Sequence, residues 1–208
     1  MKQKLMPRWL IIKLTGILFA IYSAYYIFLI IKDGKTFPRE GIVISTIVAL
    51  SFALLTVFAW TTEVKSLRFL RIRKTMVIIT LLAIFALKLR MAGKVALYLD
   101  FSNLMTVLYF SSYFMTLAGM LVLFIYYTFI LRNIPLYPSA AVRFPLSAVI
   151  LFAISFILEI IIFFVYGIGL EASPLRTMVM RPVFFLSLIG LSAYFLFPSP
   201  FAIPESPL

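Results

Sequence analysis

Few side chains in this 208-residue sequence suit chemistry in an apolar environment, and Glu159 is the most conspicuous of them. It is the single charged residue in the apolar run 144–170, which is long enough to cross a membrane as a helix. Burying a carboxylate there is costly, so Glu159 is expected to face protein or trapped water and to have a partner. Such a group is typical of a structural ion pair or of a coupling group in a transporter.

The cations expected to pair with Glu159 are Lys88 and Arg90. In a six-helix arrangement Glu159 lies about 15 residues from the cytoplasmic start of its helix, or roughly 22 Å at 1.5 Å per residue. Lys88 lies about 13 residues past Thr75 on another outward-running helix, at a depth of roughly 20 Å, and Arg90 lies slightly further out. Ser155, four residues before Glu159, is on the same side of the helix and is placed to add a hydrogen bond.

The residues that the sequence lacks exclude most catalytic sites. There is no Cys and no His, which removes disulfides, thiol nucleophiles, His-ligated haem, ordinary zinc sites and the commonest general base. Asp33 and Asp100 stand at segment ends without a motif, and no group of carboxylates is spaced to hold a divalent cation. A Ser–Lys dyad that uses Lys88 has no spacing in its favour. We therefore expect no catalytic residue, no metal, no cofactor and no enzymatic activity.

The composition sets the class of protein. Apolar residues make up 64% of the chain and charged residues only 12%, whereas soluble domains have about half apolar and about a quarter charged residues. No stretch is polar enough to form a separate soluble domain. We predict a single integral membrane domain over residues 1–208.

The predicted fold is all-α, a bundle of about six transmembrane helices. The predicted spans are residues 9–31, 42–60, 70–90, 104–131, 144–170 and 182–197. The third is the least regular, because the apolar part 76–87 is too short to cross alone. A re-entrant or interfacial segment within 76–103 would reduce the crossings to four or five. The first run is too long for an ordinary signal-peptide core and is interpreted as a retained helix.

Basic residues give the chain a formal charge of +12 and stand at the ends of the apolar runs, where they meet anionic headgroups. Apolar residues interleave the densest cluster, which favours a helix end at anionic lipid over a nucleic-acid-binding arm. Its members are Lys65, Arg68, Arg71, Arg73 and Lys74. The positive-inside rule places this cluster and both termini in the cytoplasm, and residues 32–41 outside.

Two classes of function fit these features. The favoured one is a non-enzymatic subunit or accessory, scaffolding factor of a membrane assembly, with a protein partner or a second copy of the chain in the membrane. The alternative is a small transporter or channel for an anionic or lipid-like solute, which the basic rims favour. Many transporter sites are marked by prolines in the middle of a span, whereas here the prolines lie in loops or at helix starts. The two classes differ in whether Glu159 faces a water-filled cavity or a dry ion pair.

Overall fold

A computed structural model of the chain describes residues 8–33, 39–62, 67–97, 99–130, 138–166 and 179–196, and no strand occurs within these ranges. The helices are α1 (Arg8–Asp33), α2 (Arg39–Thr61), α3 (Leu67–Leu97), α4 (Leu104–Ile125), α5 (Pro138–Tyr166) and α6 (Arg181–Leu196). A π-helical turn, η1 (Tyr126–Ile130), extends α4. The predicted all-α fold is confirmed.

Helix length and composition make the chain a multi-pass membrane protein. Helices α1 to α5 are each long and apolar enough to cross a bilayer. The uncertain third helix is continuous for 31 residues, and its apolar part Thr75–Lys94 is long enough to cross. The 16 residues of α6 span only about 24 Å, less than a hydrocarbon core of about 30 Å.

The fifth helix differs from its prediction at both ends. It begins at Pro138 and ends at Tyr166, whereas the predicted span was 144–170, and Pro145 lies inside it. Proline suits the first position of a helix because it has no backbone N–H to donate. Pro138 and Pro145 could each mark the first position of this helix by sequence, and in the structure Pro138 is the first residue.

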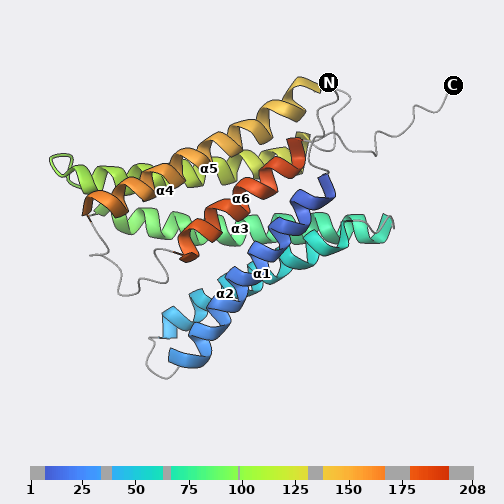
Figure 1. Cartoon of the computed structure of the whole chain (residues 1–208), viewed down its shortest axis with the longest axis horizontal. Helices are drawn as coiled ribbons and strands as arrows, with labels where there is room; N and C mark the ends of the chain where they lie inside the picture. The colour runs from blue at the N-terminus through green and yellow to red at the C-terminus, as the bar shows by residue number, and fades with distance from the viewer. Residues whose placement is uncertain are drawn as a thin grey trace.

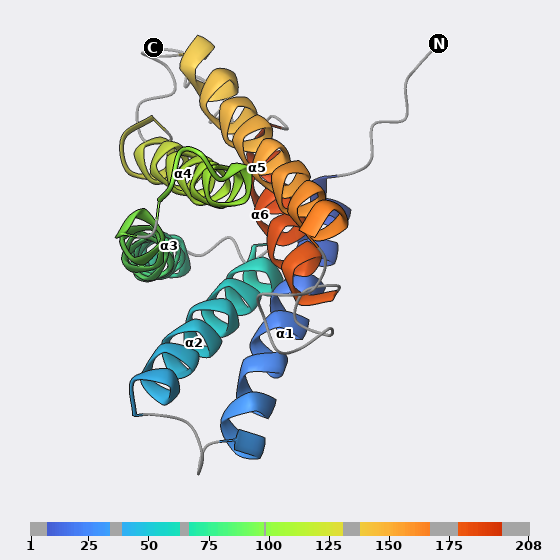
Figure 2. The same ribbon diagram turned by 90° about the vertical axis from the view of Figure 1, so that its left-hand side faces the viewer.

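The six helices form a closed ring. Consecutive helices run in opposite directions and pack side by side (Figure 1), and α6 lies between α5 and α1 (Figure 2). The starts of α1, α3 and α5 and the ends of α2, η1 and α6 therefore share one end of the bundle, called the termini end here. The other end carries the start of α6 and the end of α5.

Small residues let the helix backbones approach closely, as they do in many membrane bundles. The Ser23 hydroxyl of α1 donates a hydrogen bond to the Ala49 carbonyl of α2 at 2.9 Å. A Cβ atom on Gly119 would lie 2.8 Å from the Phe152 ring, so α4 and α5 also touch directly. Gly190 of α6 leaves no room for a side chain against Thr15 of α1. These contacts fix the spacing of the ring.

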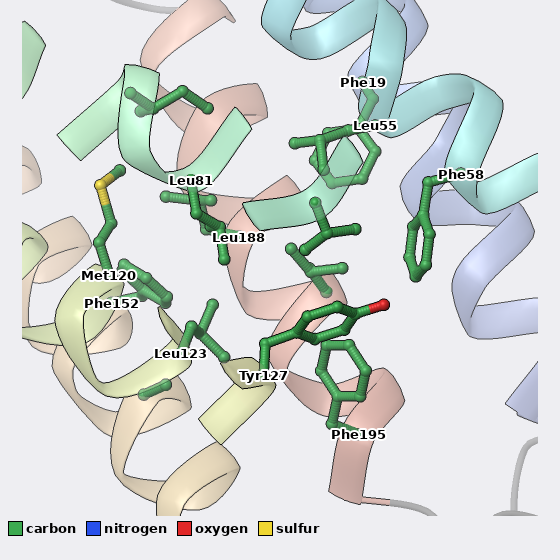
Figure 3. Close-up of a cluster of buried hydrophobic side chains, with 14 of the residues drawn as sticks. Phe19, Leu55, Phe58, Leu81, Met120, Leu123, Tyr127, Phe152, Leu188 and Phe195 are labelled. Atoms are coloured by element: carbon green, nitrogen blue, oxygen red, sulfur yellow. The ribbon is translucent and has the colours of Figure 1, made fainter. Parts of the chain in front are cut away.

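The interior of the termini half is filled with apolar and aromatic side chains. Figure 3 shows Phe58, Tyr127 and Phe195 gathered from three helices. The Phe58 and Tyr127 rings lie 6.5 Å apart and those of Tyr127 and Phe195 5.4 Å apart, centroid to centroid. These separations are typical of favourable edge contacts. The three aromatic side chains therefore belong to the packed core at this end of the bundle.

Lys13 lies one turn inside α1. Its ammonium group donates a hydrogen bond to the Trp60 carbonyl at 3.2 Å and lies 4.8 Å from the centroid of the Trp60 ring. That carbonyl is at the end of α2, where the last C=O groups lack intrahelical partners. Lys13 therefore links two helices at the termini end.

The connection from α3 to α4 is a compact polar turn. The Asn103 side chain accepts the backbone N–H of Met105 and caps α4. The Asp100 carboxylate accepts hydrogen bonds from the Ser102 hydroxyl and backbone N–H, which lower its pKa below the ordinary value. This turn belongs to the surface of the bundle, since both Asp100 and Ser102 are exposed.

Candidate functional site

A cavity with a volume of about 140 Å³ lies inside the bundle, at the end opposite the termini end. All six helices contribute to its wall, and most of the lining side chains are apolar or aromatic. Four charged side chains also line it: Lys88, Arg90, Glu159 and Arg181. Ionisable groups inside a membrane bundle are costly and mark candidate functional sites.

Glu159 forms its ion pair with Arg181, in which Nη1 of the arginine donates to Oε2 of the carboxylate. The Glu159 side chain is only 10% exposed and that of Arg181 19% exposed. Arg181, which lies between the predicted spans 144–170 and 182–197, is the first residue of α6. Glu159 lies seven residues before the end of α5, or about 10 Å from that end. The pair therefore lies about halfway between the middle of α5 and its C-terminal end.

Lys88 and Arg90, the two cations expected from the sequence, both line the same cavity as Glu159. Arg90 donates to Glu40 of α2 at 2.7 Å, and both side chains are largely exposed. The Lys88 ammonium lies 4.6 Å from the centroid of the Phe184 ring and 5.0 Å from that of Tyr113, within the range of cation–π attraction. The structure therefore places Lys88 and Arg90 around the same cavity as Glu159 and adds Arg181, which the depth argument did not include.

A cluster of hydroxyl groups supports the other oxygen of Glu159. The Ser112 hydroxyl of α4 donates to Glu159 Oε1 at 2.9 Å and lies 3.0 Å from the Ser155 hydroxyl. The Ser155 hydroxyl lies 2.7 Å from that of Thr116, and all three hydroxyl-bearing residues are buried. Ser155, expected to bond to Glu159, thus connects to it through Ser112. The cluster joins α4 to α5 and fixes the direction of the carboxylate.

Among the described residues, cationic side chains outnumber carboxylates around the cavity. Lys88, Arg90 and Arg181 line the cavity with Glu159, and Glu40 pairs with Arg90 beside it. The three cations and two carboxylates leave a formal excess of one positive charge among the described residues. In a low-dielectric interior such an excess attracts anions much more strongly than it would in water.

The two other predictions about binding concern the basic cluster 65–74 and the absence of a metal site. Lys65 lies outside the described residues, and of the other four basic residues in the 65–74 cluster only the backbone, in the first turns of α3, is described. Anionic-lipid contact by this cluster stays a prediction. Within the described ranges no group of three or more carboxylates could hold a metal ion.

No protein-family model matches the chain, and no curated protein or solved structure shows a significant match.

Proposed function

We propose that this chain is a non-enzymatic integral membrane protein that binds an anionic solute in the cavity, as a small transporter. The observation that supports the proposal is the excess of cationic side chains around an intramembrane cavity. An apolar bundle has no packing need for such groups, whose burial is costly.

The accessory-subunit function, favoured by composition, has less specific support. It relies on the apolar outer surface of the bundle, which lipid would cover equally well. The cavity, in contrast, is one local feature with an electrostatic preference. Because the termini half is packed around Phe58, Tyr127 and Phe195, the proposal is for a site reached from one side, and not for an open channel.

The orientation that we propose places both termini and the 65–74 cluster in the cytoplasm, so that the cavity end faces outward. The chain has no cysteine of its own. A cysteine at Thr36 should therefore label from outside with an impermeant thiol reagent, whereas one at Ser66 should label only after permeabilisation. The reverse labelling pattern would mean that the cavity opens to the cytoplasm.

Anion binding should appear as thermal stabilisation of the purified protein in a neutral detergent, because a ligand that binds only the folded state stabilises it. We expect at least one of three sodium salts, phosphate, benzoate or dodecyl phosphate, to raise the melting temperature in a saturable manner. Replacing Lys88 with Gln should raise the half-effect concentration about tenfold, which corresponds to a loss of about 1.4 kcal/mol.

Lys94 provides a matched control for this experiment. It lies on the same helix as Lys88, is exposed and does not line the cavity. Lys94→Gln removes the same formal charge and should leave the half-effect concentration unchanged. Equal losses in the two variants would assign the effect to the net charge of the protein, and no saturable stabilisation by any of the three salts would refute the proposed function.

A further inference from the structure

The size of the cavity limits what it can hold. Its volume of about 140 Å³ is close to the roughly 150 Å³ of an engineered apolar cavity that binds benzene. A single ring, or a short branched or linear chain of similar volume, fits this space. The acyl chain of a membrane lipid is much larger.

Three aromatic rings form one wall of the cavity. Tyr22 of α1, Phe52 of α2 and Phe184 of α6 all line it and contact one another, with ring centroids 4.4 Å, 5.6 Å and 6.0 Å apart. Aromatic faces offer large apolar contact to an organic group. They do not replace the water molecules that a strongly hydrated inorganic anion loses on burial.

The cationic groups lie beside this wall. Lys88 is positioned over the Phe184 ring, and Arg181 lies three residues before Phe184 on the same helix. A ligand that contacts the aromatic wall therefore has two cations next to it. The formal excess of one positive charge, counted above with Glu159 and Glu40 included, matches a ligand with a single negative charge.

We propose that the cavity takes a monovalent organic anion whose apolar body is about as large as a benzene ring. The anionic group, such as a carboxylate, lies toward Lys88 and Arg181, and the body lies against the aromatic wall of Tyr22, Phe52 and Phe184. This inference rests on the proposed function and adds the class of solute to it. It separates the ligand from inorganic phosphate, which lacks an apolar body, and from long-chain lipids, most of whose acyl chain would lie outside this volume.

The test compares ligands that differ in one property each, on the full chain in a neutral detergent. Benzoate and benzyl alcohol differ in charge, benzoate and inorganic phosphate differ in the apolar body, and hexanoate and dodecanoate differ in chain length. We expect half-effect concentrations for benzoate and hexanoate at least tenfold below that for phosphate. Benzyl alcohol should give no stabilisation that depends on Lys88, and dodecanoate should bind no more tightly than hexanoate.

A second measurement probes the aromatic wall. Phe184→Leu should weaken benzoate binding at least fivefold, while Phe164→Leu, at a position on α5 that is 78% exposed, should leave it unchanged. The ligand series on the unaltered chain remains decisive if Phe184→Leu does not fold, because it needs no substitution.

The outcomes separate this inference from the proposed function. Lys88-dependent binding in which phosphate equals or exceeds benzoate would overturn the compact organic ligand and leave the anion site in place. Binding that tightens tenfold from hexanoate to dodecanoate would overturn it in favour of a lipid-like ligand. Equal effects of benzoate and benzyl alcohol, or no Lys88-dependent effect of any anion, would overturn both.

Discussion

Replacing Glu159 with Gln is expected to lower the free energy of unfolding by about 3 kcal/mol, because it leaves the guanidinium of Arg181 without its carboxylate in a largely buried site. The amide can still accept a hydrogen bond from Ser112, so packing in the hydroxyl cluster is preserved. Unfolding in mixed micelles of a neutral detergent and dodecyl sulfate measures this change. Arg181→Gln should cause a loss of similar size.

The double variant Glu159→Gln with Arg181→Gln should recover much of each loss, since it leaves no unpaired charge. We expect a coupling free energy of about 2 kcal/mol between these two positions. Strictly additive losses would show that the pair contributes nothing to stability.

A matched cycle tests the partner that the sequence predicted. Arg90 pairs with Glu40, so Glu159→Gln and Arg90→Gln should be additive within about 0.5 kcal/mol. A coupling free energy between Glu159 and Arg90 as large as that between Glu159 and Arg181 would mean that Arg90 is also a partner of Glu159.

Gly190→Ala is expected to destabilise the protein by about 2 kcal/mol, although alanine favours a helix over glycine by about 1 kcal/mol. The added methyl group would overlap the Thr15 hydroxyl and lie 3.3 Å from the Thr15 Cβ atom. The Thr15 hydroxyl is held by a 2.7 Å hydrogen bond to the Ile11 carbonyl, so α1 and α6 must separate. Unfolding in mixed micelles again gives the measurement.

Gly93 is the control for this substitution. It is also a helical glycine, but a Cβ atom there would meet nothing within 4 Å. Gly93→Ala should be neutral or stabilise the protein by up to about 1 kcal/mol. In the background of Thr15→Ala, Gly190→Ala should cost less than half as much as it does alone. If Gly190→Ala behaved like Gly93→Ala, the close contact between the first and last helices would not exist.

The sequence predicted the helices of this fold because long apolar runs leave few alternatives. Six predicted spans correspond to six observed helices, and the third, uncertain from its short apolar part, is continuous as α3. Basic residues at both of its ends are compatible with a long helix, because their side chains can extend to the headgroups. The boundaries were harder to predict where prolines near a helix start compete, as Pro138 and Pro145 do.

The partner of Glu159 was missed for a physical reason. Arg181 stands directly before Pro182 and at the end of a polar stretch, both typical of a loop. The available signal was the length of α6. A helix of 16 residues cannot reach both membrane faces, so its first residue can lie at the depth of a buried carboxylate. The hydroxyl cluster was missed because single Ser and Thr residues in spans commonly bond to their own helix.

The closed ring also has a consequence for the order in which the protein assembles. Five of its six main helix contacts join neighbours along the chain, and these can form as each helix emerges from the ribosome. The contact of α1 with α6 joins opposite ends of the sequence and pays the largest loop-closure cost. Until α6 is synthesised, Thr15 lacks its neighbour and Glu159 lacks Arg181. Synthesis of α6 therefore both closes the bundle and completes the charged site.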